Sequence, residues 1–210
     1  MQKVLKDQII AVSLQRFLKY GARKMTVQKL VEPLSISTKT VYKYFADKED
    51  LLKNCLTVHY QDLAKKFAVI AKNKTSSPVM ILSQLWRETM KLDFGVNEIF
   101  YYDLNYYYPQ LQDSVIKKVF KKYPIVLKKI IEDGRKRGYF RKDIVPAVVA
   151  DALEVLYANI TRTGKFKGSG LTPIVILENT IDVYLRGLCT QKGLQELEQW
   201  NTSGKLRIIL

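Results

Sequence analysis

The stretch of sequence that decides the fold is residues 26–52, TVQKLVEPLSISTKTVYKYFADKEDLL. Thr26 is placed to cap a short helix over residues 27–33, and Ser37 to cap a second over 38–45, because a hydroxyl can accept a hydrogen bond from a free amide of a first helical turn. Only a tight turn near residues 34–36 separates the two. This spacing predicts a helix-turn-helix, whose second helix enters a DNA major groove.

The second of these helices has an inner and an outer face. Val41 and Phe45 lie four residues apart, so both can face a core. The residues left to face outward are Thr38, Lys39, Tyr42 and Lys43. Hydroxyl and ammonium groups can donate hydrogen bonds to base edges and phosphates, so this face is typical of a DNA-reading surface. A solvated helix would also expose its lysines, but it would have less reason to expose tyrosines beside them.

The next helix is predicted to begin at Asp47 and carries Lys48 in its first turn. A lysine there is disfavoured by a few tenths of a kcal/mol, because the helix N-terminus is the positive end of the dipole. The free backbone N–H groups of the same turn attract anions. One interpretation is that Lys48 binds a DNA phosphate. The other is that it pairs with Glu49 or Asp50, and the sequence leaves both open.

Residues 5–53 resemble the N-terminal domain of the tetracycline-repressor-like (TetR/AcrR) transcriptional regulators. The residues that carry the resemblance are Phe17 and Gly21; Thr26 and Val27; Ser37, Thr40, Val41, Tyr42, Tyr44 and Phe45; and Lys48, Glu49, Leu51 and Leu52. Two features depart from the family pattern. The family has Ala-Gly in the turn, where this chain has Leu34 and Ser35, and Ser35 lacks the freedom of glycine at positive φ. Pro33 is expected to shorten the first helix of the pair.

The resemblance implies two kinds of DNA contact. The phosphate contacts it implies are Thr26, Ser37, Tyr42, Tyr44 and Lys48. The base-edge contacts it implies are Thr38, Lys39, Thr40 and Lys43, with Lys39 and Lys43 the candidates for guanine. The alternative is that Thr26 and Ser37 are only helix caps and that Tyr44 belongs to the core.

The rest of the chain is also predicted to be helical. Helices are expected to start at Ser77-Pro78, Asn97, Pro146 and Thr172-Pro173, to end at Gly21 and Gly138, and to break at Pro124. We therefore expect an all-α fold, with a three-helix helix-turn-helix DNA-binding domain over residues 1–53. A larger helical ligand-binding and dimerisation domain is expected over 54–195, and a tail of uncertain structure over 196–210.

Composition excludes several classes of protein. The chain has 210 residues, of which 47% are hydrophobic, and a net charge of +15, which favours polyanionic partners. Two cysteines, Cys55 and Cys189, and no signal peptide or apolar run of membrane-spanning length predict a cytoplasmic protein without a membrane partner. With one histidine, no metal-ligand spacing and no phosphate-binding loop, we expect no enzyme activity, metal or cofactor.

Two late helices, over about 146–163 and 173–190, carry apolar residues on most of their sides. A single core needs an apolar stripe only about 100° wide, so the excess predicts a second burial surface, such as a two-fold dimer interface. The predicted interface residues are Val149, Leu153, Leu156, Ile160, Ile174, Leu177, Ile181 and Leu185. The alternative is that both helices are central in the monomer, and the family resemblance favours the homodimer.

Aromatic residues concentrate between Trp86 and Tyr108. Such clusters are more often core than pocket. Many buried tyrosine hydroxyls would each need a partner, however, and this favours a cavity for a mostly apolar or aromatic ligand. The predicted ligand-binding residues are His59, Trp86, Met90, Phe94, Phe100, Tyr102 and Tyr106.

Together these features predict a ligand-responsive transcriptional regulator that acts as a repressor. It would bind a near-palindromic double-stranded DNA operator as a homodimer and be released by a small-molecule effector. The alternative is a DNA-binding regulator or architectural protein without a small-molecule ligand, which would have a solid core instead of a cavity.

Overall fold

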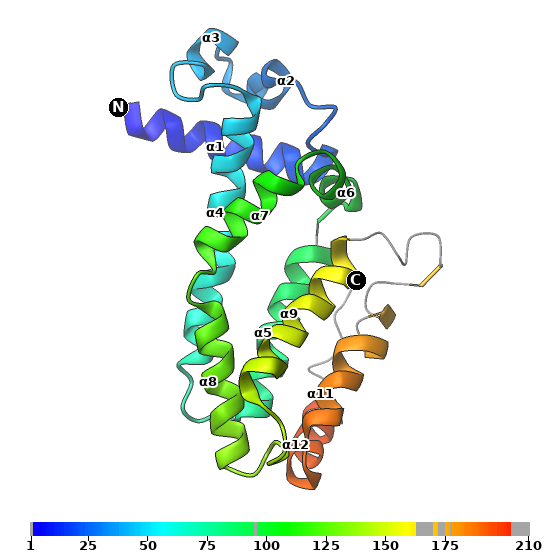
Figure 1. Ribbon diagram of the computed structural model, residues 1–210. Coiled ribbons are helices and arrows are strands. Elements are labelled where there is room, and N and C mark those ends of the chain that lie inside the picture. Colours follow the sequence, from blue (N-terminus) through cyan, green and yellow to red (C-terminus); the bar gives the residue numbers. More distant parts are fainter. Residues whose placement is uncertain (1, 95, 163–169, 172–174, 177, 203–210) are drawn as a thin grey trace. The chain divides into compact units, whose positions relative to one another are not determined.

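The computed structural model describes residues 2–94, 96–162, 170–171, 175–176 and 178–202. Over these residues the protein is helical, and the only β-type pairing among them is an isolated antiparallel bridge between Phe140 and Cys189. The all-α prediction is confirmed (Figure 1). The elements are α1 (Gln2–Tyr20), α2 (Val27–Val31), a 3-10 turn (Glu32–Leu34), α3 (Thr38–Val41), α4 (Lys48–Ala71), α5 (Pro78–Phe94), α6 (Glu98–Tyr107), α7 (Pro109–Val119), α8 (Tyr123–Lys136), α9 (Pro146–Arg162), a π-helical turn (Glu178–Asp182), α11 (Val183–Leu188) and α12 (Gln191–Thr202).

The chain forms two compact units. The first, here called the head unit, comprises Met1–Lys65 and Lys91–Lys121, and the second, the body unit, comprises Lys66–Met90 and Lys122–Leu210. The head unit therefore holds α6 and α7 in addition to the helix-turn-helix. The functional boundary expected at residue 53 stays a prediction.

Helix ends follow the glycine and proline signals in the sequence. Gly21 ends α1 with φ +83°, a conformation that favours glycine, and its amide donates to the Phe17 carbonyl at 2.9 Å. Gly138 follows α8 with φ +74°. Pro124 lies in the first turn of α8, after the chain has broken from α7, because proline fits the start of a helix better than its interior. Pro146 opens α9 as expected, whereas Thr172 and Pro173 lie outside the described residues.

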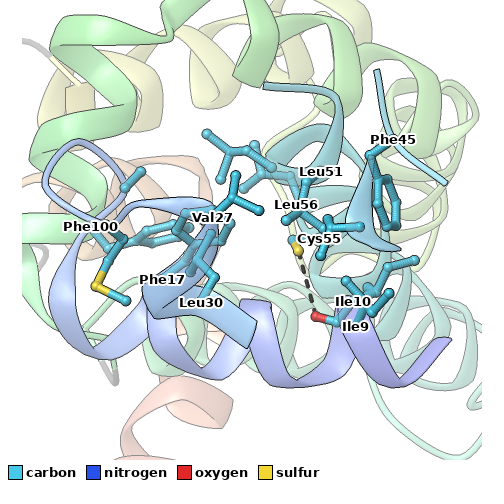
Figure 2. Close-up of a cluster of buried hydrophobic side chains, with 14 of the residues drawn as sticks. Ile9, Ile10, Phe17, Val27, Leu30, Phe45, Leu51, Cys55, Leu56 and Phe100 are labelled. Carbon is cyan, nitrogen blue, oxygen red and sulfur yellow. Dashed lines mark hydrogen bonds between the residues drawn. The ribbon is translucent and has the colours of Figure 1, made fainter. Parts of the chain in front are cut away.

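The core of the head unit is assembled from helices that are distant in the sequence. Figure 2 shows Phe17 of α1 and Leu30 of α2 beside Phe100 of α6, with Leu51 of α4 in the same cluster. All four side chains are fully buried, and burying each stabilises the fold by about 1.5–3 kcal/mol. The thiol of Cys55 lies 3.5 Å from the carbonyl oxygen of Ile10 (Figure 2). This core holds the helix-turn-helix, α4 and α6 as one packed body.

The body unit packs α8 against α9 and extends to α12. Gly134 of α8 allows close packing, because a side chain there would overlap the ring of Phe140. The segment from residue 196, expected as a tail of uncertain structure, is helical up to Thr202. Leu197 is buried, and the Glu196 carboxylate accepts a hydrogen bond from the Ser77 hydroxyl. Periodicity alone did not predict this helix, because few of its residues are apolar. None of the helices in the described ranges has the length and apolar character needed to cross a membrane.

Candidate nucleic-acid interface

The two helices of the predicted helix-turn-helix are capped as the sequence predicts. The Thr26 hydroxyl accepts a hydrogen bond from the Lys29 amide at 3.3 Å. The Ser37 hydroxyl accepts from the Thr40 amide at 3.1 Å and also lies 3.0 Å from the Thr40 hydroxyl. Thr26 and Ser37 are both exposed. The capping role is therefore confirmed, and it leaves both hydroxyls accessible to a phosphate.

The turn between these helices is strained. Ser35 adopts φ +52°, a left-handed conformation that costs a residue with a side chain about 1–2 kcal/mol. α2 ends at Val31, and Pro33 lies in the 3-10 turn that follows. Both departures from the family pattern thus have the expected effects, a shorter first helix and a strained turn.

α3 ends earlier than the sequence predicts. Its α-helical bonding covers Thr38–Val41, not residues 38–45. The chain then continues in tight turns, in which the Phe45 amide still donates to the Val41 carbonyl at 3.2 Å. The inner face is as predicted, because Val41 and Phe45 are buried in the head-unit core.

The outer face of α3 and its following turn carries the predicted DNA contacts. Lys39, Tyr42 and Lys43 are exposed, with 51% of Tyr42 accessible. Thr38, Thr40 and Tyr44 are half-buried, and Tyr44 packs partly against the core cluster. We call the set Thr38, Lys39, Thr40, Tyr42 and Lys43 the reading face. It presents two ammonium groups and a phenol on a segment that the buried side chains of Val41 and Phe45 anchor in the core.

Lys48 has a partner that neither interpretation of the sequence foresaw. Its ammonium donates to the carbonyl oxygen of Arg23 at 3.0 Å, in the connection between α1 and α2. Asp50 is occupied elsewhere, since its carboxylate accepts from the Ala46 amide at 3.1 Å. Partial burial lowers the pKa of Lys48, and the Asp103 carboxylate acts in the opposite direction. An ammonium has three N–H donors, so the bond to Arg23 leaves two for a phosphate.

Asp103 of α6 is a buried residue that sequence reasoning missed. It is 5% exposed, and its carboxylate accepts from the Arg23 amide at 2.8 Å. A signal was present in the sequence. Phe100, Asp103 and Leu104 follow the spacing of one helix face, and all three are buried. A lone carboxylate in an apolar stripe needs a specific hydrogen-bond donor.

The predicted ligand-binding residues are divided between the two units. In the head unit His59 is buried, with its Nε2 atom 3.3 Å from the Tyr101 hydroxyl, and burial lowers its pKa to about 4. Phe100 is part of the solid core. Tyr102 and Tyr106 are 40% and 68% exposed and stack on each other at 5.8 Å between ring centroids. The rings of Tyr102 and Tyr106, four residues apart, share an outward face of α6. The ligand-binding role of the predicted set stays a prediction.

The other predicted ligand-binding residues belong to α5. Trp86 lies in the body unit, 8% exposed, with its ring 5.3 Å from that of Tyr157. Its indole N–H is buried without a hydrogen-bond partner. The side chains of Met90 and Phe94 lie outside the described residues. Of the predicted set, Trp86 is the one that combines burial with an unused donor.

The predicted dimer stripe is partly the core of the body unit. Val149, Leu153, Ile181 and Leu185 are buried within the chain, and Leu156 and Ile160 are half-buried. Ile174 and Leu177 lie outside the described residues. The exposed apolar side chains of these helices are instead Val148, Val155 and Val183, at 62%, 60% and 59%. Apolar residues on every side of a helix do not reveal which side meets the chain's own core, so the predicted interface stays a prediction.

Comparison with known proteins agrees with this geometry. Residues 9–55 match the family model of bacterial regulatory proteins of the tetR family. A search of curated protein sequences finds no significant match. Among solved structures, the chain is similar to a TetR/AcrR-family transcriptional regulator from Thermobifida fusca, with a TM-score of 0.68 and 21% identity over 87% of this chain and 97% of that one.

Two further solved structures share the fold. A transcriptional regulator from Cytophaga hutchinsonii has a TM-score of 0.67 at 16% identity, covering 88% of this chain and 98% of that one. The regulator FadR from Bacillus subtilis, solved with stearoyl-CoA, has a TM-score of 0.65 at 16% identity, covering 86% and 98%. Residues 9–55 therefore match the tetR family model, and the chain has the fold of the TetR/AcrR transcriptional regulators.

Proposed function

We propose that this protein is a ligand-responsive transcriptional repressor that binds a near-palindromic operator as a homodimer. The observation that carries the proposal is the reading face, in which Lys39, Tyr42 and Lys43 are exposed while Val41 and Phe45 anchor the same segment in the core. The fold of the TetR/AcrR regulators supports the same function. The protein would work in the cytoplasm, as a regulator and not as an enzyme.

DNA binding would divide the work between two sets of side chains. Lys39 and Lys43 would donate to guanine O6 and N7, with Thr38 and Thr40 as further base-edge contacts. Thr26, Ser37, Tyr42, Tyr44 and Lys48 would contact phosphates and fix the register on the duplex. The two reading faces of a dimer must meet sites about 34–36 Å apart, one turn of DNA, and this requires an inverted repeat.

The test is selection of duplexes from a random DNA pool by the purified full-length protein. We expect an enriched inverted repeat, with base preferences that relax in a Lys39→Ala variant. A matched control is Lys118→Ala, which removes one exposed positive charge from α7 outside the reading face. Enrichment of no sequence, or equal effects of both variants on base preference, would contradict the proposal.

The exposed valines support a dimer through the body unit. Val148 and Val155 on α9 and Val183 on α11 place apolar surface in water unless a second copy covers them. We expect Val155→Glu to dissociate the dimer, whereas Val69→Glu on α4, at a valine that is 73% exposed, leaves it intact. Sedimentation of the wild type as a monomer at micromolar concentration would contradict this part of the proposal.

The ligand would be small and mostly apolar or aromatic, and it would bind the body unit near Trp86. The unused indole N–H could donate to a carbonyl or carboxylate oxygen. The likeness to FadR of Bacillus subtilis, solved with stearoyl-CoA, makes long-chain acyl-CoA a first probe. We expect an effector to lower DNA affinity in the wild type and not in a Trp86→Phe variant that still binds DNA. Equal responses of both proteins to stearoyl-CoA, or to aromatic carboxylates tested beside it, would show that Trp86 is not part of the site.

A further inference from the structure

The connection between α1 and α2 is held by a chain of hydrogen bonds that links α6 to α4. The Arg23 amide donates to the Asp103 carboxylate at 2.8 Å, and the Arg23 carbonyl accepts from the Lys48 ammonium at 3.0 Å. We call these two bonds the Arg23 bridge. Both backbone polar groups of Arg23 are thus hydrogen-bonded, the amide to a residue of α6 and the carbonyl to the first residue of α4.

α6 makes further contacts to the same region. The Asn97 amide group, next to the start of α6, donates to the Lys19 carbonyl at 3.0 Å. The Arg23 guanidinium lies over the Tyr107 ring, 4.2 Å from its centroid, and donates to the Tyr107 hydroxyl. A side chain on Gly21 would come within 2.6 Å of the Asp103 carboxylate and 2.7 Å of Ile99. The end of α1 and the connection therefore lie directly against α6.

Burial of the Asp103 carboxylate costs free energy unless hydrogen-bond donors compensate for its lost hydration. A carboxylate that is 5% exposed must recover its lost hydration from fixed donors, and the Arg23 amide is one. The carboxylate also lies near Lys48, and its negative charge acts to raise the pKa of the Lys48 ammonium. Asp103 thus bonds the segment that leads to Thr26 and influences the charge of Lys48. Thr26 follows Arg23 by three residues, and Lys48 bonds to Arg23 itself.

We propose that Asp103 is a positioning residue for DNA binding, which fixes Thr26 and Lys48 through the Arg23 bridge and makes the phosphate contacts depend on α6. The inference rests on the proposed function, since it concerns how the same DNA site is held. Because Thr26 and Lys48 would meet phosphates and not bases, loss of the Arg23 bridge weakens binding to every DNA sequence alike.

The experiment compares Asp103→Asn with the wild-type full-length protein. The variant keeps the shape of the side chain, removes its charge and leaves a neutral amide oxygen as a weaker acceptor for the Arg23 amide. A matched control is Glu98→Gln, which removes one negative charge from an exposed position on the same helix. Affinity is measured for the selected operator and for a scrambled duplex of the same length, over a series of salt concentrations. Melting temperature and dimer mass are measured on the same samples.

We expect Asp103→Asn to weaken binding to both duplexes by about tenfold, with the ratio of the two affinities unchanged within about twofold and a shallower salt dependence. Glu98→Gln should bind as tightly as the wild type or slightly more tightly. Wild-type affinity and salt dependence in Asp103→Asn would overturn the inference. So would a loss confined to the operator, because that outcome places the damage in the reading face.

Two further outcomes are distinguishable. If the wild type itself does not prefer the operator over the scrambled duplex, the proposed function fails, and this inference fails with it. If Asp103→Asn does not fold, Asp103→Glu decides the matter, because it keeps the charge and displaces the carboxylate from the Arg23 amide by one methylene. A uniform loss of about twofold to threefold in Asp103→Glu would support the Arg23 bridge, and unchanged binding would overturn it.

Discussion

The head and body units differ in how closely local spacing determines their structure. In the head unit, Val41 and Phe45 lie four residues apart between polar residues, and Phe17 lies on the apolar face of α1. Each segment therefore has one face that can turn inward, and these residues form the core. In the body unit, α9 carries apolar residues on opposite sides, with Leu153 buried and Val155 exposed two positions later. A helix with one narrow apolar stripe shows which of its faces is buried in the core. A helix that is apolar on several sides shows only that more than one side is buried, and not which side meets the core of its own chain.

The largest effect is expected at the centre of the head unit. Phe17→Ala should lower the free energy of unfolding by about 3–5 kcal/mol, because the side chain is fully buried and the removed ring leaves a cavity. Urea denaturation followed by circular dichroism measures this change. A loss below about 1 kcal/mol would mean that the head unit is packed more loosely than its sequence pattern implies.

The helix-turn-helix could be predicted in detail because each of its signals acts within a few residues. Thr26 and Ser37 cap the turns that follow them, and Pro33 shortens α2. The Asp103 contact to Arg23 could not be predicted in this way, since 80 residues separate the partners. Nor could spacing show that Tyr102 and Tyr106 face outward, because the aromatic helix α6 has large side chains on all sides. The π-helical turn over Glu178–Asp182 has no local signal that we recognise.

A pair of variants on α9 compares the buried and the exposed apolar sides of this helix directly. Leu153→Ala should cost about 2–5 kcal/mol of unfolding free energy, because Leu153 is fully buried in the body unit. Val155→Ala should change it by less than about 0.5 kcal/mol in a monomeric background such as Val183→Glu, because Val155 is 60% exposed. Similar costs for both residues, measured by urea denaturation, would show that the chain's own core does not distinguish the two sides.

The single histidine gives the head unit a dependence on pH. Burial lowers the pKa of His59 from 6.5 to about 4, so between these values the unfolded chain binds a proton that the folded chain does not. Stability contributed by neutral His59 is therefore complete above pH 6.5 and is lost as the pH falls towards 4, by an amount on the order of 3 kcal/mol.

The measurement is unfolding free energy against pH for the wild type and for His59→Gln. The variant should show a smaller decline between pH 6.5 and 4, since it has no imidazole to protonate. Parallel curves for the two proteins would mean that the imidazole is accessible to water in the folded head unit.

The smallest expected effect is that of Lys48→Ala on DNA binding. Loss of one phosphate contact should reduce the slope of log affinity against log salt by about 0.9, equally for operator and scrambled DNA. The bond to the Arg23 carbonyl is lost too, so part of any weakening at high salt comes from the connection itself. An unchanged slope would mean that Lys48 serves only the fold of the head unit.

The central claim is that the reading face recognises a specific DNA sequence, and the ratio of two dissociation constants tests it most directly. These are the constants of the full-length protein for its selected inverted repeat and for a scrambled duplex, measured by fluorescence anisotropy at 0.15 M salt. We predict a ratio of at least about 10³, falling by about tenfold or more in Lys39→Ala and unchanged in Lys118→Ala. A ratio near one in the wild type would contradict the claim.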